Sequence, residues 1–325
     1  MAADTSIEGP SPPAGSGVQA AAAGVSPPPA GSGEATSAEP EAWATLIGTP
    51  VLFLAGAIVG YLLALPATAL LTRIGSASPH PPPLKEVLFG PAGLPMRTVT
   101  SLWFTAACTA LAVVASVRGH PLGWRERLGL RRGRIPAQDL PAIVAANFGA
   151  FGLGLVLLEA LRAAGVRLPA TDAFRELFLS MRSAGPVLGA TFVFGGSVLV
   201  GVEEELLFRG FLQRRLLRAW HPAAALLVTA LFFDLAHVLP ARLIGLLGSC
   251  LWLGYLAWRA DSIVPGIVCH ACLNAVAQSI GMFSTWTMEL HRPGVSLWGL
   301  IGSALVSLAL VGLGVFRVER RVRTP

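Results

Sequence analysis

Three short runs of acidic, basic and imidazole side chains interrupt apolar sequence in the second half of this chain. The first run, GVEEELLFRG, occupies residues 201–210, the second ends in His237, and the third contains His270 and Asn274. Ionisable groups are costly in apolar surroundings and mark functional sites by default. Carboxylates and imidazoles together can activate a water or hold a metal ion.

The three glutamates of the first run differ in the partners that a helix would give them. Glu205 and Arg209 lie four residues apart, with the acid before the base, so they face and can neutralise each other. Glu204 points about 100° away from Glu205 and lacks that partner. An unpaired carboxylate in a low-dielectric site is a candidate general base. Glu203 lies on a third face, for which we expect lipid headgroups or another helix. The alternative is that the whole run forms a solvated surface helix.

Two histidines and an asparagine favour a buried cluster over a surface helix. His237 lies deep in the apolar run 232–238, and His270 and Asn274 lie four residues apart on one helix face that Gln278 continues. A single histidine in such surroundings is most often a packing residue. Two histidines, an amide stripe and a glutamate pair together indicate a cluster that does chemistry.

A helical hairpin accounts for part of the expected convergence. Glu204 and His237 lie almost equally far from His221 and Pro222 along the chain. Two antiparallel helices that turn there therefore place both side chains at a similar depth. His270 comes early in its apolar run whereas His237 comes late, so simple alternating helices predict an axial offset of about 10 Å between them. A tilted or interrupted helix would have to close that gap.

The composition identifies lipid as the surroundings of these helices. Of the 325 residues, 54% are hydrophobic and 13% are charged, and the mean hydropathy is +0.65, whereas a soluble domain carries roughly 25% charged residues. Apolar runs of about 20 residues can cross a bilayer as helices, which satisfy their own backbone hydrogen bonds. We therefore predict an all-α polytopic membrane helical bundle, which excludes most soluble enzyme folds.

About eight transmembrane helices are expected. Several apolar runs are near the lower length limit for spanning, so the number could differ by one or two. The predicted spans are 44–71, 98–117, 140–161, 186–202, 223–239, 243–258, 263–283 and 297–316.

The first 41 residues are rich in Pro, Ala, Gly and Ser, and we predict a disordered N-terminal tail over 1–41. This segment lacks the features of a signal peptide, so the first membrane helix must direct insertion. Arginines are more numerous on the side that holds 118–134, 209–218 and the C-terminal cluster 317–323 than on the opposite side. The positive-inside rule therefore predicts that both termini are cytoplasmic.

The net charge of +6 does not indicate nucleic acid as a partner, because the positive charge lies in short loops between apolar segments. Lys85 is the only lysine, and Arg, Ala, Gly and Pro are abundant. This composition is typical of a GC-rich genome and predicts a bacterial inner-membrane protein. Cys269 and Cys272 flank His270 in a C-x-x-C, for which packing is favoured over a metal or redox role.

Together the three runs resemble the CPBP family of intramembrane proteases, which includes type II CAAX prenyl endopeptidases and bacteriocin-processing, Abi-like proteins. The family motifs E-E-x-x-x-R, F-x-x-x-H and H-x-x-x-N occur in order. They are formed by Glu204, Glu205 and Arg209, by Phe233 and His237, and by His270 and Asn274. The resemblance covers about residues 186–283. Asp234 is unusual inside the second motif, where we expect it to orient His237 or to pair with an arginine.

The resemblance implies hydrolysis of a peptide bond by a glutamate-activated water. Glu204 would be the general base, assisted by His237, while His270 and Asn274 would donate hydrogen bonds to the developing oxyanion. The implied catalytic residues are Glu204, Glu205, His237, His270 and Asn274, with Arg209, Phe233, Asp234 and Gln278 in support. No cofactor is favoured. The alternative within the family is a divalent metal such as zinc held by Glu204, His237 and His270, although no H-E-x-x-H preforms a chelate.

The predicted domains are the tail 1–41, N-terminal transmembrane helices 42–185, a CPBP-like catalytic core 186–283, and a final helix with a basic tail 284–325. The expected partners are the lipid bilayer and a membrane-anchored or lipidated protein or peptide substrate. One alternative function is a catalytically silent immunity or scaffold protein of the same fold. Another is a proton-coupled transporter, against which the uneven spans without matching halves argue.

Overall fold

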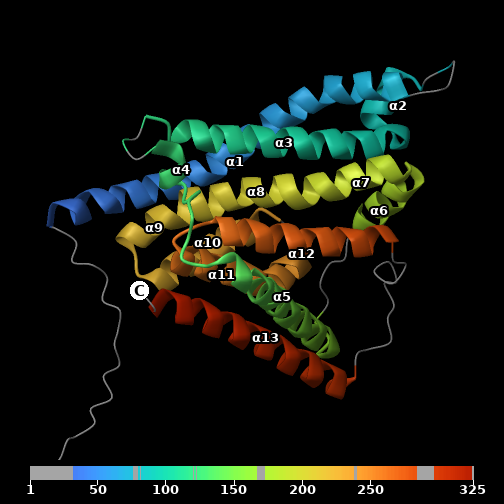
Figure 1. The fold of residues 1–325 in the computed structure, drawn as a ribbon. Helices are drawn as coiled ribbons and strands as arrows, with labels where there is room; N and C mark the ends of the chain where they lie inside the picture. The colour runs from blue at the N-terminus through green and yellow to red at the C-terminus, as the bar shows by residue number, and fades with distance from the viewer. Residues whose placement is uncertain are drawn as a thin grey trace, which may run out of the picture.

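The computed structural model describes residues 32–75, 80, 82–119, 121, 123–166, 173–237, 240–283 and 296–323. Within these residues the secondary structure is helical and no strand occurs, which confirms the predicted all-α helical bundle (Figure 1). Residues 1–31 of the predicted tail lie outside the described part. Helix α1 begins at Ser32, so the end of the segment predicted as disordered is helical.

Seven helical segments of the described residues are long and apolar enough to cross a membrane, and one shorter apolar helix accompanies them. The seven are α1 (Ser32–Gly75), α3 (Leu94–Ser116), α5 (Leu140–Ala163), the continuous segment Pro186–Ala219, α11 (Pro240–Ala260), α12 (Val264–Phe283) and α13 (Leu297–Arg323). The shorter helix is α10 (Pro222–Leu235). The chain is therefore an integral multi-pass membrane protein. Seven of the eight predicted spans are long enough to cross, whereas the one predicted over 223–239 corresponds to the shorter α10.

Short helices join the long ones at both ends of the bundle. They are α2 (Leu84–Phe89), η1 (Pro91–Gly93), α4 (Gly123–Arg127), η2 (Ala137–Asp139) and α6 (Ala173–Ser183). Helices α4 and α9 (Arg214–Ala219) and the C-terminal end of α13 lie at the same end of the bundle (Figure 1). We call this end, with residues 125–134, 214–218, 259 and 317–323, the arginine-rich face.

Two glycines let α1 approach α3 closely. Gly56 and Gly60 are four residues apart on α1, the spacing by which small residues line one face of a membrane helix. A Cβ added at Gly60 would lie 2.4 Å from the Thr105 Cα, and one at Gly56 would lie 2.5 Å from the Thr109 Cα. The two backbones are therefore in contact, and dispersion across this seam holds α1 against the bundle.

Gly60→Leu is expected to destabilise the protein by about 1 to 3 kcal/mol, because the added side chain meets backbone that cannot move aside. The measurement is the free energy of unfolding in detergent. Gly48→Leu is the matched control on the same helix, since a Cβ there has nothing within 4 Å. Equal losses in the two variants would show that glycine at the α1–α3 contact has no special role.

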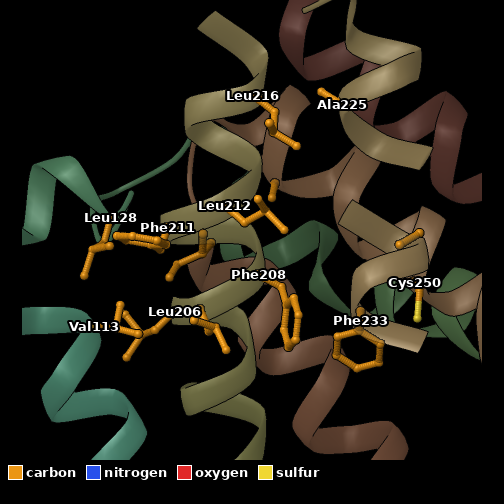
Figure 2. Close-up of a cluster of buried hydrophobic side chains, with 14 of the residues drawn as sticks. Val113, Leu128, Leu206, Phe208, Phe211, Leu212, Leu216, Ala225, Phe233 and Cys250 are labelled. Carbon is orange, nitrogen blue, oxygen red and sulfur yellow. The ribbon is translucent and has the colours of Figure 1, made fainter. Parts of the chain in front are cut away.

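The largest buried apolar cluster lies around the segment that carries the glutamates (Figure 2). Leu206, Phe208, Phe211 and neighbouring side chains of this segment point toward α3, α4, α10 and α11 in Figure 2. The Phe208 and Phe233 rings meet edge to face with centroids 5.1 Å apart. This packing fixes the rotation of the glutamate-bearing segment relative to α10.

The turn between α11 and α12 is anchored by one carboxylate at the arginine-rich face. Asp261 has a φ of 52°, in the left-handed region that Asp and Asn tolerate better than most residues. Its side chain accepts a hydrogen bond from Arg214 at 3.0 Å and another from Arg131. Partial burial acts to raise the pKa of Asp261, but the hydrogen bonds and charges of the two arginines outweigh it and hold the pKa below its usual value.

Asp261→Asn is expected to lower stability at neutral pH and to have a smaller effect in acid. A carboxylate whose pKa is lowered by folding stabilises the folded state fully above its unfolded-state pKa of about 3.9, and this contribution is lost as the pH falls through the lower folded-state value. Asn keeps the backbone conformation, so the comparison isolates the charge. Unfolding curves of the two proteins at pH 7 and near pH 3 would test this. A difference that does not shrink in acid would contradict the ion-pair explanation.

Candidate active site

The three glutamates lie in the middle of one continuous helical segment that is interrupted by two π-helical stretches. It consists of α7 (Pro186–Phe194), the π-helical η3 (Gly195–Leu199), α8 (Val200–Glu204), the π-helical η4 (Glu205–Gln213) and α9. Such π-helical turns are rare and are frequent at functional sites. Here they begin and end around the glutamates and set the directions in which those side chains point.

Glu205 and Arg209 form the predicted pair, and both side chains are fully buried. Arg209 donates from Nη1 to the Glu205 Oε1 at 3.0 Å and from Nη2 to the Cys250 carbonyl oxygen at 3.2 Å. Its guanidinium carbon lies 4.5 Å from the centre of the Phe233 ring. A buried ion pair needs such additional partners to offset the desolvation of both charges. Arg209 therefore joins the glutamate segment to α10 and α11.

His270 contacts both glutamates. Its Nδ1 lies 3.1 Å from the Glu205 Oε1, and its Nε2 lies 3.3 Å from the Glu204 Oε2. Since an ionised carboxylate only accepts hydrogen bonds, Nδ1 carries the proton toward Glu205. That leaves the Nε2 facing Glu204. Glu205, held by Arg209, thus orients the imidazole against the second carboxylate.

His237 approaches Glu204 from the other side. Its Nδ1 lies 3.0 Å from the Phe233 carbonyl oxygen, which can only accept, so this nitrogen is the donor. The Nε2 consequently faces the Glu204 Oε1, at 4.0 Å. The Phe233 ring packs against both imidazoles, with centroids 4.9 Å from His237 and 5.8 Å from His270. Glu204 is 13% exposed and His237 is 17% exposed, so their polar atoms retain limited access.

The expected axial offset of His270 is wrong. The reason is that α12 begins deeper in the bundle than the turn between α9 and α10. The α11–α12 turn is level with Arg214, which pairs with Asp261, and not with the end of α9. A Cβ added at Gly266, in the first turn of α12, would lie 2.9 Å from the Glu205 Oε2. One further helical turn brings His270 to the level of the glutamates.

Asn274 and Gln278 continue along α12 and lie against η3. Asn274 donates from Nδ2 to the Gly196 carbonyl oxygen at 3.1 Å. A Cβ added at Gly196 would lie 2.3 Å from the Gln278 Nε2, so the Gln278 amide occupies the space beside that glycine. Asn274 has a second amide hydrogen that remains available to a ligand. The structure thus places Asn274 one turn beyond His270, facing the same glutamate-bearing segment.

The expectation for Asp234 needs correction, and the two alternatives for Glu203 are reduced to one. The Asp234 side chain does not hydrogen-bond His237 or an arginine among the described contacts; it accepts from the Cys250 Sγ at 3.2 Å. Helix α10 ends one residue after Asp234, so the turn carries the two side chains in different directions. Glu203 is 5% exposed, which agrees with the expected alternative of another helix and not with lipid headgroups, and its Oε1 has no hydrogen-bond partner in the described part of the chain.

Asn147 on α5 supports the site and was missed from the sequence. It is fully buried, donates from Nδ2 to the Cys269 carbonyl oxygen at 3.1 Å, and accepts from the Ser249 hydroxyl at 2.7 Å. These bonds tie α5, α11 and α12 together next to His270. The sequence feature that could have indicated this role is a lone asparagine in the middle of an apolar span. Cys269 is a free, buried thiol.

No group of three or more His, Cys, Asp or Glu side chains among the described residues has the arrangement of a metal site. Glu204, His237 and His270 nevertheless present a carboxylate and two imidazole nitrogens to one another, which is a donor set that zinc accepts. A small rearrangement of these side chains would therefore suffice for coordination.

Comparison with known proteins shows similarity to one family in the second half of the chain. Residues 186–276 match the model of a family described as Type II CAAX prenyl endopeptidase Rce1-like. The matched segment runs from the start of α7 to the second turn after His270 and contains all three motifs. Searches of curated proteins and of solved structures returned no match.

Proposed function

Because residues 186–276 are similar to Rce1-like type II CAAX prenyl endopeptidases, we propose that this membrane protein is an intramembrane endopeptidase of the CPBP type. It hydrolyses a peptide bond of a membrane-associated protein or peptide with a water that Glu204 activates. The observation that carries the proposal is the position of Glu204. Its two carboxylate oxygens face one imidazole nitrogen each, from His237 and His270.

This arrangement supports different roles for the two adjacent carboxylates, Glu204 and Glu205. Glu205 is neutralised by Arg209 and serves to hold His270. Glu204 lies beside imidazoles, which can exchange protons near neutral pH, whereas an arginine cannot. Of the two, only the Glu204 carboxylate is therefore suited to take up and release a proton during turnover.

The proposed reaction conserves atoms and charge at each step. Glu204 removes a proton from water while the water oxygen bonds to the scissile carbonyl carbon, and the carbonyl oxygen becomes an oxyanion. That charge is stabilised by the second amide hydrogen of Asn274 and by a protonated His270, which donates from Nε2 while its Nδ1–H remains on Glu205. The carbon–nitrogen bond then breaks as the proton passes from Glu204, with the help of His237, to the leaving amine. The products are a carboxylic acid and an amine, which ionise to a carboxylate and an ammonium group by transfer of one proton.

A metal-dependent mechanism is the alternative within the same fold. Glu204, His237 and His270 would hold the ion, which would supply a Lewis acid and an activated water. In that case Glu205, which contacts the His270 Nδ1, would act like the carboxylate that orients many metal-bound histidines. Metal analysis of the purified protein distinguishes the two. If the purified protein contains less than one metal ion per chain and still cleaves its substrate after a chelator is added, the glutamate mechanism is supported.

The proposed setting is the inner membrane of a bacterium, with both termini in the cytoplasm. The arginine-rich face then lies on the cytoplasmic side, as the positive-inside rule requires. The substrate is a membrane-anchored or lipidated protein, because Glu204, His270 and Asn274 lie within membrane-spanning helices. Soluble proteins without an anchor are not expected to reach them.

The proposal is tested in cells by comparing membrane-protein termini among three strains, which express the wild type, Glu204→Gln or no protein. Peptide ends that occur only with the wild type identify the substrate and its cleavage site. A phenotype of the deletion strain that Glu204→Gln restores at matched expression, without any new peptide ends, would instead support a catalytically silent scaffold or immunity protein.

A further inference from the structure

The buried pair of Arg209 and Glu205 uses only one of its two possible hydrogen bonds. The Arg209 Nη1 donates to the Glu205 Oε1 at 3.0 Å, while Nη2 donates to the Cys250 carbonyl oxygen at 3.2 Å. The Arg209 Nε and the Glu205 Oε2 are buried and have no hydrogen-bond partner in the part of the chain that the structure describes. A guanidinium and a carboxylate prefer two parallel hydrogen bonds. Something in the surroundings must therefore hold the guanidinium in the single contact.

The single contact matters because His270 shares the same carboxylate. The Glu205 Oε1 accepts from Arg209 and also lies 3.1 Å from the His270 Nδ1. A guanidinium that turned toward both oxygens would draw the carboxylate to itself and compete with the imidazole. His270 would then lose the acceptor that keeps the proton on its Nδ1. Its Nε2 would no longer be fixed toward Glu204.

A second carboxylate, Asp234, lies on the Cys250 side of the guanidinium. Cys250 links the two groups, since its carbonyl oxygen accepts from Arg209 and its thiol donates to the Asp234 Oδ1 at 3.2 Å. The guanidinium also lies over the ring of Phe233, the residue before Asp234, and its charge acts on the Asp234 carboxylate. Asp234 is 2% exposed, so little water screens this attraction.

We propose that Asp234 is a positioning residue whose charge holds Arg209 to one hydrogen bond with Glu205 and thereby leaves Glu205 free to orient His270. Asp234 contacts none of the reacting groups and acts only through Arg209. This inference deepens the proposed function and rests on it for the effect on rate. The effect on the proton of the His270 Nδ1 does not require that the protein cleave anything.

Asp234→Asn is the variant that tests this role. Asparagine has the size of aspartate and keeps an oxygen that can accept from the Cys250 thiol, so the substitution removes mainly the charge. The guanidinium is then expected to turn toward both oxygens of Glu205. With the substrate found in cells, kcat should fall by about 10- to 100-fold, the usual effect of losing a group that orients a ligand or catalytic side chain. KM should change little, because Asp234 does not contact the substrate.

The direct readout is the ¹⁵N NMR spectrum of the full-length protein in detergent, labelled with ¹⁵N only at histidine. The His270 signals are assigned by their absence from His270→Gln. In the wild type we expect a protonated Nδ1. In Asp234→Asn we expect that signal to lose intensity to a form of His270 whose Nδ1 has no proton.

Thr229→Val is the matched control, because Thr229 is a buried polar residue of the same helix. Its Oγ1 has no hydrogen-bond partner among the described residues. The control should leave both kcat and the His270 spectrum unchanged. If Asp234→Asn does not fold, Asp234→Ser removes the same charge and should give the same spectral change.

An unchanged Nδ1 signal in a folded, uncharged variant of Asp234 overturns the proposal even if kcat falls, because Asp234 would then act through packing alone. The same spectral change in Thr229→Val also overturns it, since any buried polar residue of α10 would have the effect. Failure of the proposed function has a different signature. A folded wild type that cleaves no substrate contradicts proteolysis, whereas the spectral comparison of Asp234→Asn with the wild type is still valid.

Discussion

Glu204→Gln is expected to lower the rate of proteolysis by about 10²- to 10⁴-fold, the usual contribution of a general base. Glutamine has the size of the carboxylate but cannot take a proton from water. The close polar contacts of Glu204 are with His237 and His270 and not with an arginine. The substitution should therefore leave the fold intact. The measurement is the initial rate of cleavage of an identified substrate in proteoliposomes, with thermal unfolding followed in parallel.

Glu203→Gln is the matched control, because the chain places an equivalent buried carboxylate directly beside Glu204. Its Oε1 has no hydrogen-bond partner among the described residues, so the amide replaces an ionisable group without breaking a known contact. We expect activity close to that of the wild type and equal or higher stability. Equal losses of activity in the two variants would mean that Glu204 acts only through the general polarity of the helix.

Arg209→Met is expected to destabilise the protein by about 3 to 5 kcal/mol, the cost of leaving one partner of a buried ion pair alone. Both Arg209 and Glu205 are fully buried. Without the guanidinium, the Glu205 carboxylate keeps only His270 as a close polar partner among the described contacts. The measurement is the free energy of unfolding in detergent, together with the binding of a substrate fragment that reports the orientation of His270.

The double variant Glu205→Gln, Arg209→Met separates the buried charge from the packing of the two side chains. It removes both charges at once, so a substantial part of the stability lost in Arg209→Met should return. Activity should stay low, because His270 has lost the carboxylate that orients it. A double variant that is less stable than Arg209→Met would show that the methionine packs poorly and that the charge is not the main cause.

The membrane helices were predictable because their signal is local. Apolar length alone marks each span, and the hairpin at His221 and Pro222 follows from turn residues between two spans. The contact between Glu205 and Arg209 is equally local, since both side chains lie on one helical segment. Lengths and neighbours along one helix are properties that a single sequence contains.

The depth of His270 could not be predicted, because it depends on a contact between distant segments. Arg214 and Asp261 are separated by 47 positions in the chain, and their pairing sets the level at which α12 begins. The sequence contains both residues, but neither periodicity nor composition says that they meet. The partners of Asp234 and Asn147 were missed for the same reason, since each lies on another helix.

The central claim is that the cluster around Glu204 hydrolyses a peptide bond. It is tested most directly by incubating the purified protein with the substrate found in cells, in proteoliposomes made in ¹⁸O-labelled water, and weighing both products. We predict one ¹⁸O atom in the new carboxyl group, a free new amino terminus on the other product, and neither product with Glu204→Gln. Undiminished cleavage by Glu204→Gln, or no cleavage by the folded wild type, would contradict the claim.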